Sequence, residues 1–118
     1  MWPVVVFEAD GWPIVVAGPD EVSAVSEEDF WDEVRIAFDS DFVAVVVAPN
    51  EGLHRRFIRT QGLPQPDAVG EHGRRALVQF DRKKFARWRK ANPQRADEIA
   101  RWNPRRVWSE LTTQFGAG

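Results

Sequence analysis

The chain contains no cysteine, only two histidines and no apolar run long enough to cross a membrane. Without cysteine there can be no disulfide, no thiolate nucleophile and few of the usual structural zinc sites. His54 and His72 are the only imidazoles, which disfavours a histidine-based metal site. The longest apolar run, 42–49, is far shorter than the roughly 20 residues that span a bilayer. We therefore expect no metal, no cofactor and no membrane partner.

Sequence motifs for nucleotide binding and for nucleophilic catalysis are also missing. No glycine cluster resembles a P-loop or a Gly-x-Gly-x-x-Gly loop, and no serine lies in a Gly-x-Ser-x-Gly elbow. The first ten residues, MWPVVVFEAD, lack the basic leader of a secretory signal. We expect a cytoplasmic, non-catalytic protein whose 118 residues form a single domain, 1–118. Arginine outnumbers lysine by 13 to 3, which is typical of a GC-rich bacterial or phage genome.

The net charge of −2 conceals a division between the two halves of the chain. Residues 1–52 carry twelve acids and one base, Arg35, for a net charge of −11. Residues 53–118 carry fifteen bases and six acids, for a net charge of +9. Halves of opposite sign either attract each other within one fold or present two faces to two partners, and the sequence leaves both alternatives open.

The first half predicts a hairpin, a helix and two further strands. Apolar runs over 2–8 and 12–17 flank an Asp-Gly pair, which tolerates positive φ in tight hairpin turns. A helix is predicted over 27–38, because large apolar residues recur there every four positions after a serine cap. The unbroken apolar run 42–48 predicts a central strand buried on both faces, and 53–59 a peripheral antiparallel return.

Three short helices are predicted in the basic stretch from Asp81 to Phe115. Two Asn-Pro pairs divide this stretch, and because Asn suits the cap and Pro the first helical position, helices are expected to open near Arg82, Pro93 and Pro104. Before them, the Gly- and Pro-rich segment 61–73 predicts an exposed loop and 75–80 a last strand. The fold class is α+β, with a mainly antiparallel sheet of about five strands, one amphipathic helix after the first hairpin and two to three short C-terminal helices.

An acidic surface is predicted on the outer face of the first helix. Acids in a first helical turn suit the helix dipole, but the cluster between Asp20 and Asp41 exceeds what capping requires. Such a surface would mimic nucleic acid or plug a basic cleft, and its long-range attraction would speed association. An ordinary solvated helix face is the alternative. The candidate protein-binding residues are Glu28, Asp29, Asp32 and Glu33.

A basic surface is predicted on the first C-terminal helix. Helical spacing would place Lys83, Arg87 and Lys90 in a cationic stripe opposite a packed aromatic side. Such a stripe suits phosphates or an acidic partner, with Trp88 or Trp102 available for base stacking. A solvated face over core tryptophans is the alternative. The candidate nucleic-acid-binding residues are Lys83, Arg87, Lys90, Arg105, Arg106 and Trp88.

One short pattern, Pro66-Asp67 followed by Asp81-Arg82-Lys83, resembles the PD-(D/E)xK metal-dependent nucleases. In that family two carboxylates hold a divalent metal that polarises the phosphate, while the lysine supports the attacking species or the developing charge. The resemblance implies Asp67 and Asp81 as metal ligands. It covers under a fifth of the chain, and an acid-x-Lys match is frequent by chance.

These observations favour a small, non-catalytic protein-binding module. Inhibitors, immunity proteins and mobile-element accessory proteins are similar to it in make-up, with one domain, no cofactor motif and segregated charge. A nucleic-acid-binding protein that uses the basic, Trp-containing C-terminal helices is the second interpretation, and a metal-dependent nuclease is the third. The identity of the protein partner and the oligomeric state stay open.

Overall fold

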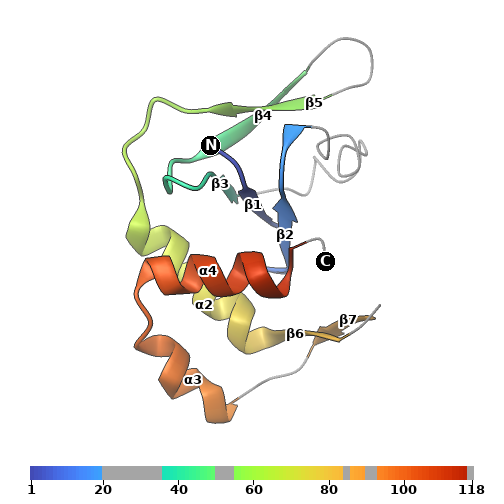
Figure 1. The fold of residues 1–118 in the computed structure, drawn as a ribbon, viewed down its shortest axis with the longest axis vertical. Helices are drawn as coiled ribbons and strands as arrows, with labels where there is room; N and C mark the ends of the chain where they lie inside the picture. Colours follow the sequence, from blue (N-terminus) through green and yellow to red (C-terminus); the bar gives the residue numbers. More distant parts are fainter. Residues whose placement is uncertain (20–35, 50–54, 84–85, 90–92, 117–118) are drawn as a thin grey trace.

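The computed structural model describes residues 1–19, 36–49, 55–83, 86–89 and 93–116. Within these residues all strand pairs are antiparallel, and the helices follow in the C-terminal half of the chain, which confirms the predicted α+β class (Figure 1). The strands are β1 (Val4–Phe7), β2 (Pro13–Val16), β3 (Ile36–Phe38), β4 (Val45–Pro49), β5 (Arg55–Arg59), β6 (Phe80–Lys83) and β7 (Ala86–Arg89). The helices are α2 (Pro66–Gln79), α3 (Pro93–Ala100) and α4 (Pro104–Gln114).

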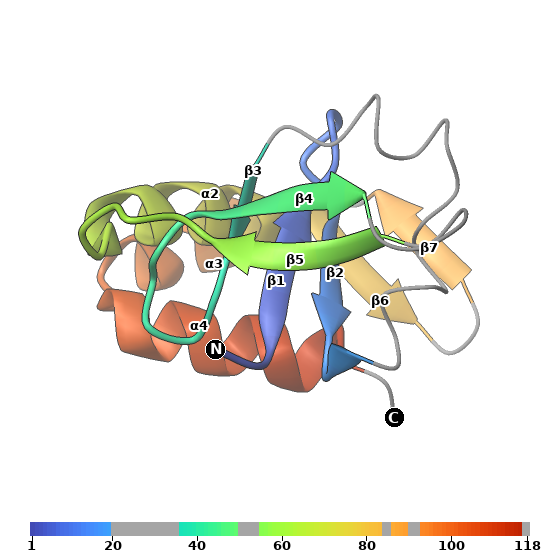
Figure 2. The same ribbon diagram turned by 90° about the horizontal axis from the view of Figure 1, so that it is seen from above.

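The three-stranded sheet, in the order β2-β1-β3, lies between two other layers. Because successive side chains of a strand point to opposite faces, β1 contributes to two cores. Val5 and Phe7 pack with residues of α2, α3 and α4, whereas Val4 and Val6 pack beneath the hairpin β4–β5. Figure 2 shows this hairpin crossing over β1 and β2. Both faces of β1 are therefore covered, which explains why all four of its residues are apolar and buried.

The predicted N-terminal hairpin is confirmed. Val5 of β1 pairs with Val15 of β2, and Gly11 in the turn has a φ of 90°. The Gly11 amide donates to the Glu8 carbonyl at 2.9 Å, and the Glu8 amide donates to the Trp12 carbonyl at 3.0 Å. β2 is an edge strand that begins with a proline, a position where the missing amide donor is tolerated.

The helix predicted over 27–38 is wrong at its C-terminal end. Residues 36–38 form β3, where Ile36 pairs with Phe7 and Phe38 with Val5. This pairing gives the second edge of β1 its hydrogen-bond partners, so tertiary context overrides the local apolar period. Residues 27–35, the rest of the predicted helix, lie outside the described residues.

The strand predicted over 42–48 is confirmed for 45–48, but its start at Phe42 and its central position are wrong. Phe42 lies in a turn with a φ of 65°, and β4 begins only at Val45. Val46 is 50% exposed, so β4 lies at the surface and not at the centre of a sheet. The antiparallel return is confirmed, because β5 pairs with β4 and places Ile58 opposite Val46.

Helix α2 occupies 66–73 of the loop predicted over 61–73, which is confirmed only for the exposed residues 61–65, and it replaces the strand predicted over 75–80 except for Phe80. Pro66 is its first residue, and proline suits this position because the first amides of a helix have no intrahelical acceptor. The Gln65 amide donates to the Phe42 carbonyl at 2.9 Å, which ties the start of α2 to the β3–β4 turn. Gly73 faces α4, and a Cβ there would collide with Val107 and Leu111. The glycine therefore serves close packing of α2 against α4.

The first of the three predicted C-terminal helices is wrong, because β6 and β7 form a hairpin. Its register pairs Asp81 with Trp88, Arg82 with Arg87 and Lys83 with Ala86. The last two helices are confirmed as α3 and α4, each beginning at the proline of an Asn-Pro pair. Asn103 caps α4, because its side-chain oxygen accepts a hydrogen bond from the Arg106 amide at 2.8 Å. Among the described residues, no helix combines the length and apolar character needed to cross a membrane.

Candidate functional site

Four exposed arginines lie along α3, just after its end and in the first turn of α4. Both helices pack against α2, and the short connection between them turns beside that helix (Figure 1). Arg95 lies in the first turn of α3 and Arg101 just after its end, whereas two arginines occupy the first turn of α4. We name the set of Arg95, Arg101, Arg105 and Arg106 the basic corner.

Trp102 is the platform of the basic corner. Its side chain is buried, with 7% of the residue exposed, and it belongs to the core between sheet and helices. The guanidinium carbon of Arg106 lies 4.4 Å from the ring centroid, and that of Arg95 lies 5.8 Å away. Arg74 of α2 fixes the backbone here, because its Nη2 and Nε donate to the Trp102 carbonyl at 2.7 and 3.2 Å. Trp102 thus has little surface left for base stacking.

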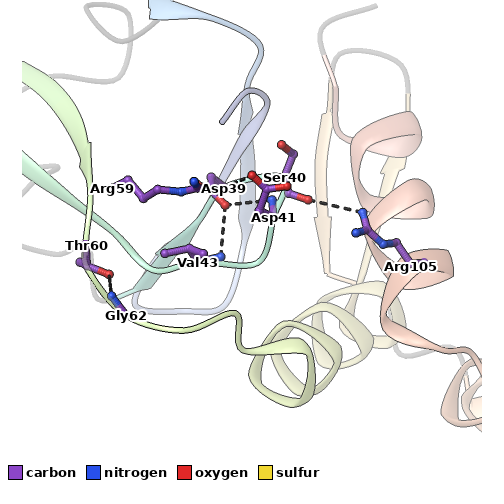
Figure 3. Close-up of polar contacts among 8 residues, drawn as sticks. All are labelled: Asp39, Ser40, Asp41, Val43, Arg59, Thr60, Gly62 and Arg105. Carbon is purple, nitrogen blue, oxygen red and sulfur yellow. Dashed lines mark hydrogen bonds and ion pairs between the residues drawn. The ribbon is translucent and has the colours of Figure 1, made fainter.

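Arg105 makes a different set of contacts. Its guanidinium carbon lies 4.7 Å from the centroid of the Phe42 ring, and its Nη1 donates to the Ser40 carbonyl at 3.5 Å (Figure 3). Stacking of a cation on an exposed aromatic face stabilises by roughly 0.5–1 kcal/mol. Arg105 therefore joins the start of α4 to the β3–β4 turn.

The turn that Arg105 reaches is organised by Asp39, which is fully buried. Its Oδ1 accepts hydrogen bonds from the Asp41 amide at 2.9 Å and the Val43 amide at 3.1 Å, and its Oδ2 accepts one from the Arg59 Nε at 2.6 Å (Figure 3). Arg59 also pairs with Asp41. These hydrogen bonds, first to Asp39 and then to Asp41, raise the pKa of Arg59. The cluster holds the turn in shape, so we assign it a structural role.

The four arginines of the basic corner form no ion pair with a described residue, although Asp97 and Glu98 lie in α3 and Glu110 lies in α4. Ion pairs among the described residues join Arg59 to Asp39 and Asp41, and Arg75 to Glu71. The first turn of α4 contains Arg105 and Arg106 but no acid. The positive end of the helix dipole disfavours each of these cations by roughly 0.3–1 kcal/mol at low salt. Two arginines at this position weaken the helix electrostatically. Their charge is thus available to a partner.

The residues predicted from sequence are distributed over several parts of the chain. Arg105 and Arg106 lie in the basic corner, Lys83 in β6, and Arg87 and Trp88 in β7. The helical stripe that was to unite the basic residues does not form, because a hairpin replaces the helix. The residues outside the described part are Glu28, Asp29, Asp32, Glu33 and Lys90.

The structure does not bring Asp67 and Asp81 together. Asp67 lies in the first turn of α2, and Asp81 lies in β6 beyond the other end of this 14-residue helix. At about 1.5 Å per residue, the helix separates the two residues by roughly 20 Å, too far for one metal ion. The resemblance to the nuclease pattern therefore stops at the sequence.

Arg95 and Arg101 are the members of the basic corner that the sequence-based prediction omitted. A signal for Arg95 is nevertheless present, because Asn-Pro-Gln-Arg at 92–95 and Asn-Pro-Arg-Arg at 103–106 repeat the same spacing. In each case the arginine is the third residue of a helix, and both arginines lie against Trp102. No family model matches the chain, and no curated protein or solved structure is significantly similar to it.

Proposed function

We propose that this chain is a small non-catalytic binding protein of the inhibitor, immunity or mobile-element accessory type, which captures a protein partner through an acidic surface of that partner. The observation that supports the proposal is the basic corner: four exposed arginines, none of which forms an ion pair with a described residue. Arginine presents a planar fork of donors that matches a carboxylate, and charge complementarity speeds association. The protein works without a cofactor and, by default, in the cytoplasm.

Two observations favour an acidic protein surface over nucleic acid. The basic corner is compact, whereas binding along a phosphate backbone uses a longer track of cations. Trp102 is buried and Trp108 is equally covered, so neither offers a ring for base stacking.

Nucleic-acid binding is the second candidate, because the hairpin β6–β7 adds further basic residues next to α2. A two-stranded ribbon fits the major groove of duplex DNA, so Lys83 and Arg87 need no helix to approach phosphates. This candidate predicts a steep loss of affinity with salt.

A titration with defined probes tests the proposal. Fluorescence anisotropy at two salt concentrations would compare a labelled polyglutamate peptide with labelled duplex and single-stranded DNA. We expect polyglutamate to bind, and the triple variant Arg95→Glu, Arg101→Glu, Arg106→Glu to lower its affinity by at least about tenfold, because reversal replaces attraction with repulsion. Arg56→Glu, at an exposed position of β5, is the matched control and should change the affinity little.

The outcomes separate the two candidates. Tighter binding of DNA than of polyglutamate, with a steep salt dependence that the triple variant reduces, would replace the protein-binding proposal with the nucleic-acid one. Binding of none of the probes at low salt would overturn both. A protein partner, once identified, allows one more test: reversing Asp29, Asp32 and Glu33 to Lys should abolish its capture if the acidic half contributes, and unchanged capture would remove these residues from the interface.

A further inference from the structure

A groove of about 340 Å³ lies between α2 and α3, beside the basic corner. Val78 of α2 lines it on one side, and Ala96, Ile99 and Ala100 of α3 line it on the other. The two alanines are one helical turn apart, so their short side chains leave a notch on the same face of α3. An apolar cavity of about 150 Å³ is enough to hold a benzene ring. The groove therefore has room for at least one large apolar side chain.

Arginines border this apolar groove. Arg74 and Arg75 line it from α2. Arg74 is held in place by its two hydrogen bonds to the Trp102 carbonyl, and Arg75 makes an exposed ion pair with Glu71 at 3.4 Å. On α3, Arg95 and Arg101 directly precede and follow residues 96–100, a segment that lines the groove and also contains the exposed acids Asp97 and Glu98. An apolar floor thus lies within a charged rim, whose cationic part is Arg74 and Arg75 of α2 together with Arg95 and Arg101.

We propose that this groove docks an acidic amphipathic segment of the protein partner. An apolar side chain of that segment enters the notch of Ala96 and Ala100, while its carboxylates pair with the arginines of the rim. This inference rests on the proposed function, because the basic corner supplies part of the rim. Helix-in-groove recognition of this kind draws affinity from the apolar anchor and orientation from the charges.

The chemistry of the groove selects this occupant over the other classes of ligand. Phosphates of a nucleic acid gain nothing from a floor made of valine, isoleucine and alanine side chains. A purely acidic peptide would use the rim and leave the floor in water. Only a segment that carries both kinds of side chain matches the rim and the floor at once.

Two labelled peptides of equal length and equal negative charge test the inference. The first has leucines at helical i, i+3, i+4 and i+7 spacing among glutamates, and the second has serines in place of the leucines. Because burial of a leucine removes apolar surface from water, we expect the leucine peptide to bind on the order of tenfold tighter in anisotropy titrations.

Variants locate this gain. Ala100→Phe fills the notch at an exposed position, and it should bring the leucine peptide down to the affinity of the serine peptide. Ala100→Gln places polar atoms at the same position without an aromatic ring, and it should also reduce the gain. It serves as the test variant if circular dichroism shows that Ala100→Phe is unstable. Thr113→Phe, on the exposed face of α4, is the control and should preserve the gain.

The possible results distinguish the inference from the proposed function. Equal binding of both peptides, or a gain that Ala100→Phe and Ala100→Gln leave intact, would overturn docking in the groove and leave the proposed function standing. Failure of both peptides to bind would overturn the proposed function itself. Self-association of the protein that Ala100→Phe abolishes would show that a second copy fills the groove, which would also overturn the inference.

Discussion

The guanidinium of Arg106 lies over the ring of Trp102, with 4.4 Å between the guanidinium carbon and the ring centroid. Trp102 is 7% exposed and anchored in the core, whereas Arg106 is exposed. A flexible side chain is thus held on a rigid support. Less side-chain entropy remains to be lost when a carboxylate binds, so pre-organised arginines bind more tightly than free ones.

This relationship predicts that stacking matters in addition to charge. Arg106→Gln removes the charge and should weaken polyglutamate binding several-fold, on the scale of 1 kcal/mol for an exposed charge pair. Arg106→Lys keeps the charge but loses the planar fork and its fit to the indole, so its affinity should fall between those of the Arg106→Gln variant and the unchanged protein. Anisotropy at low salt measures both effects. Equal affinities for Arg106→Lys and the unchanged protein would show that the stacked geometry contributes nothing.

Gly73 is predicted to be required for the packing of α2 against α4. Gly73→Ala adds a methyl group that collides with Val107 and Leu111, so we expect a net loss of about 1–2 kcal/mol in the free energy of unfolding, even after the gain in helix propensity. Gly70→Ala is the matched control in the same helix. Its Cβ would meet the Arg74 Nη1 at 2.8 Å, and this side-chain end can move further than the packed Val107 and Leu111, at a cost limited to its hydrogen bonds with the Trp102 carbonyl. Urea unfolding should show Gly70→Ala to be the more stable of the two variants.

Asp39 is predicted to hold the β3–β4 turn together. Asp39→Ala leaves the Asp41 and Val43 amides without their acceptor and should destabilise the fold by about 2–3 kcal/mol. Asp41→Ala removes a carboxylate that is 59% exposed and should change stability by less than about 1 kcal/mol. Comparable midpoints for the two variants in urea would contradict the structural role of Asp39.

The titration of Arg59 should add little pH dependence to the free energy of unfolding near neutral pH. Its hydrogen bonds to Asp39 and Asp41 raise the pKa of Arg59 in the folded state. A raised pKa contributes stability that is fully present below the unfolded-state pKa and is lost only as the pH rises through the folded-state value. For an arginine that window lies far above the physiological range.

Local signals predicted those elements whose boundaries are set by turn and cap chemistry. The Asp-Gly pair gave the first hairpin, and the two Asn-Pro pairs gave the starts of α3 and α4. The failures share a cause, because long-range partners decided them. Pairing with β1 made a strand of 36–38, and close packing against α4 allowed a helix to contain Gly73. A single sequence does not show which segment will lie opposite a glycine or an unpaired strand edge.

The candidate site was accessible from sequence only in part. Arg105 and Arg106 were predicted because they stand in a basic stretch, but their different contacts, with Phe42 and with Trp102, depend on which rings the fold brings beneath them. The repeated Asn-Pro-x-Arg spacing marked Arg95 as well. The groove between α2 and α3 could not be predicted from the sequence, because α2 occupies a segment predicted to be a loop and a strand.

The two faces of β4 are predicted to differ sharply in their tolerance of charge. Val45 is 6% exposed and packs with Val4 and Val6 beneath the hairpin, whereas Val46, its neighbour, is 50% exposed. Val45→Lys places an ammonium group in an apolar layer and should lower the free energy of unfolding by at least about 2–3 kcal/mol. Val46→Lys should change it by no more than about 0.5 kcal/mol, because it lies at the surface. Urea unfolding of the two variants tests the register of β4 directly, since a shift by one residue would exchange their effects.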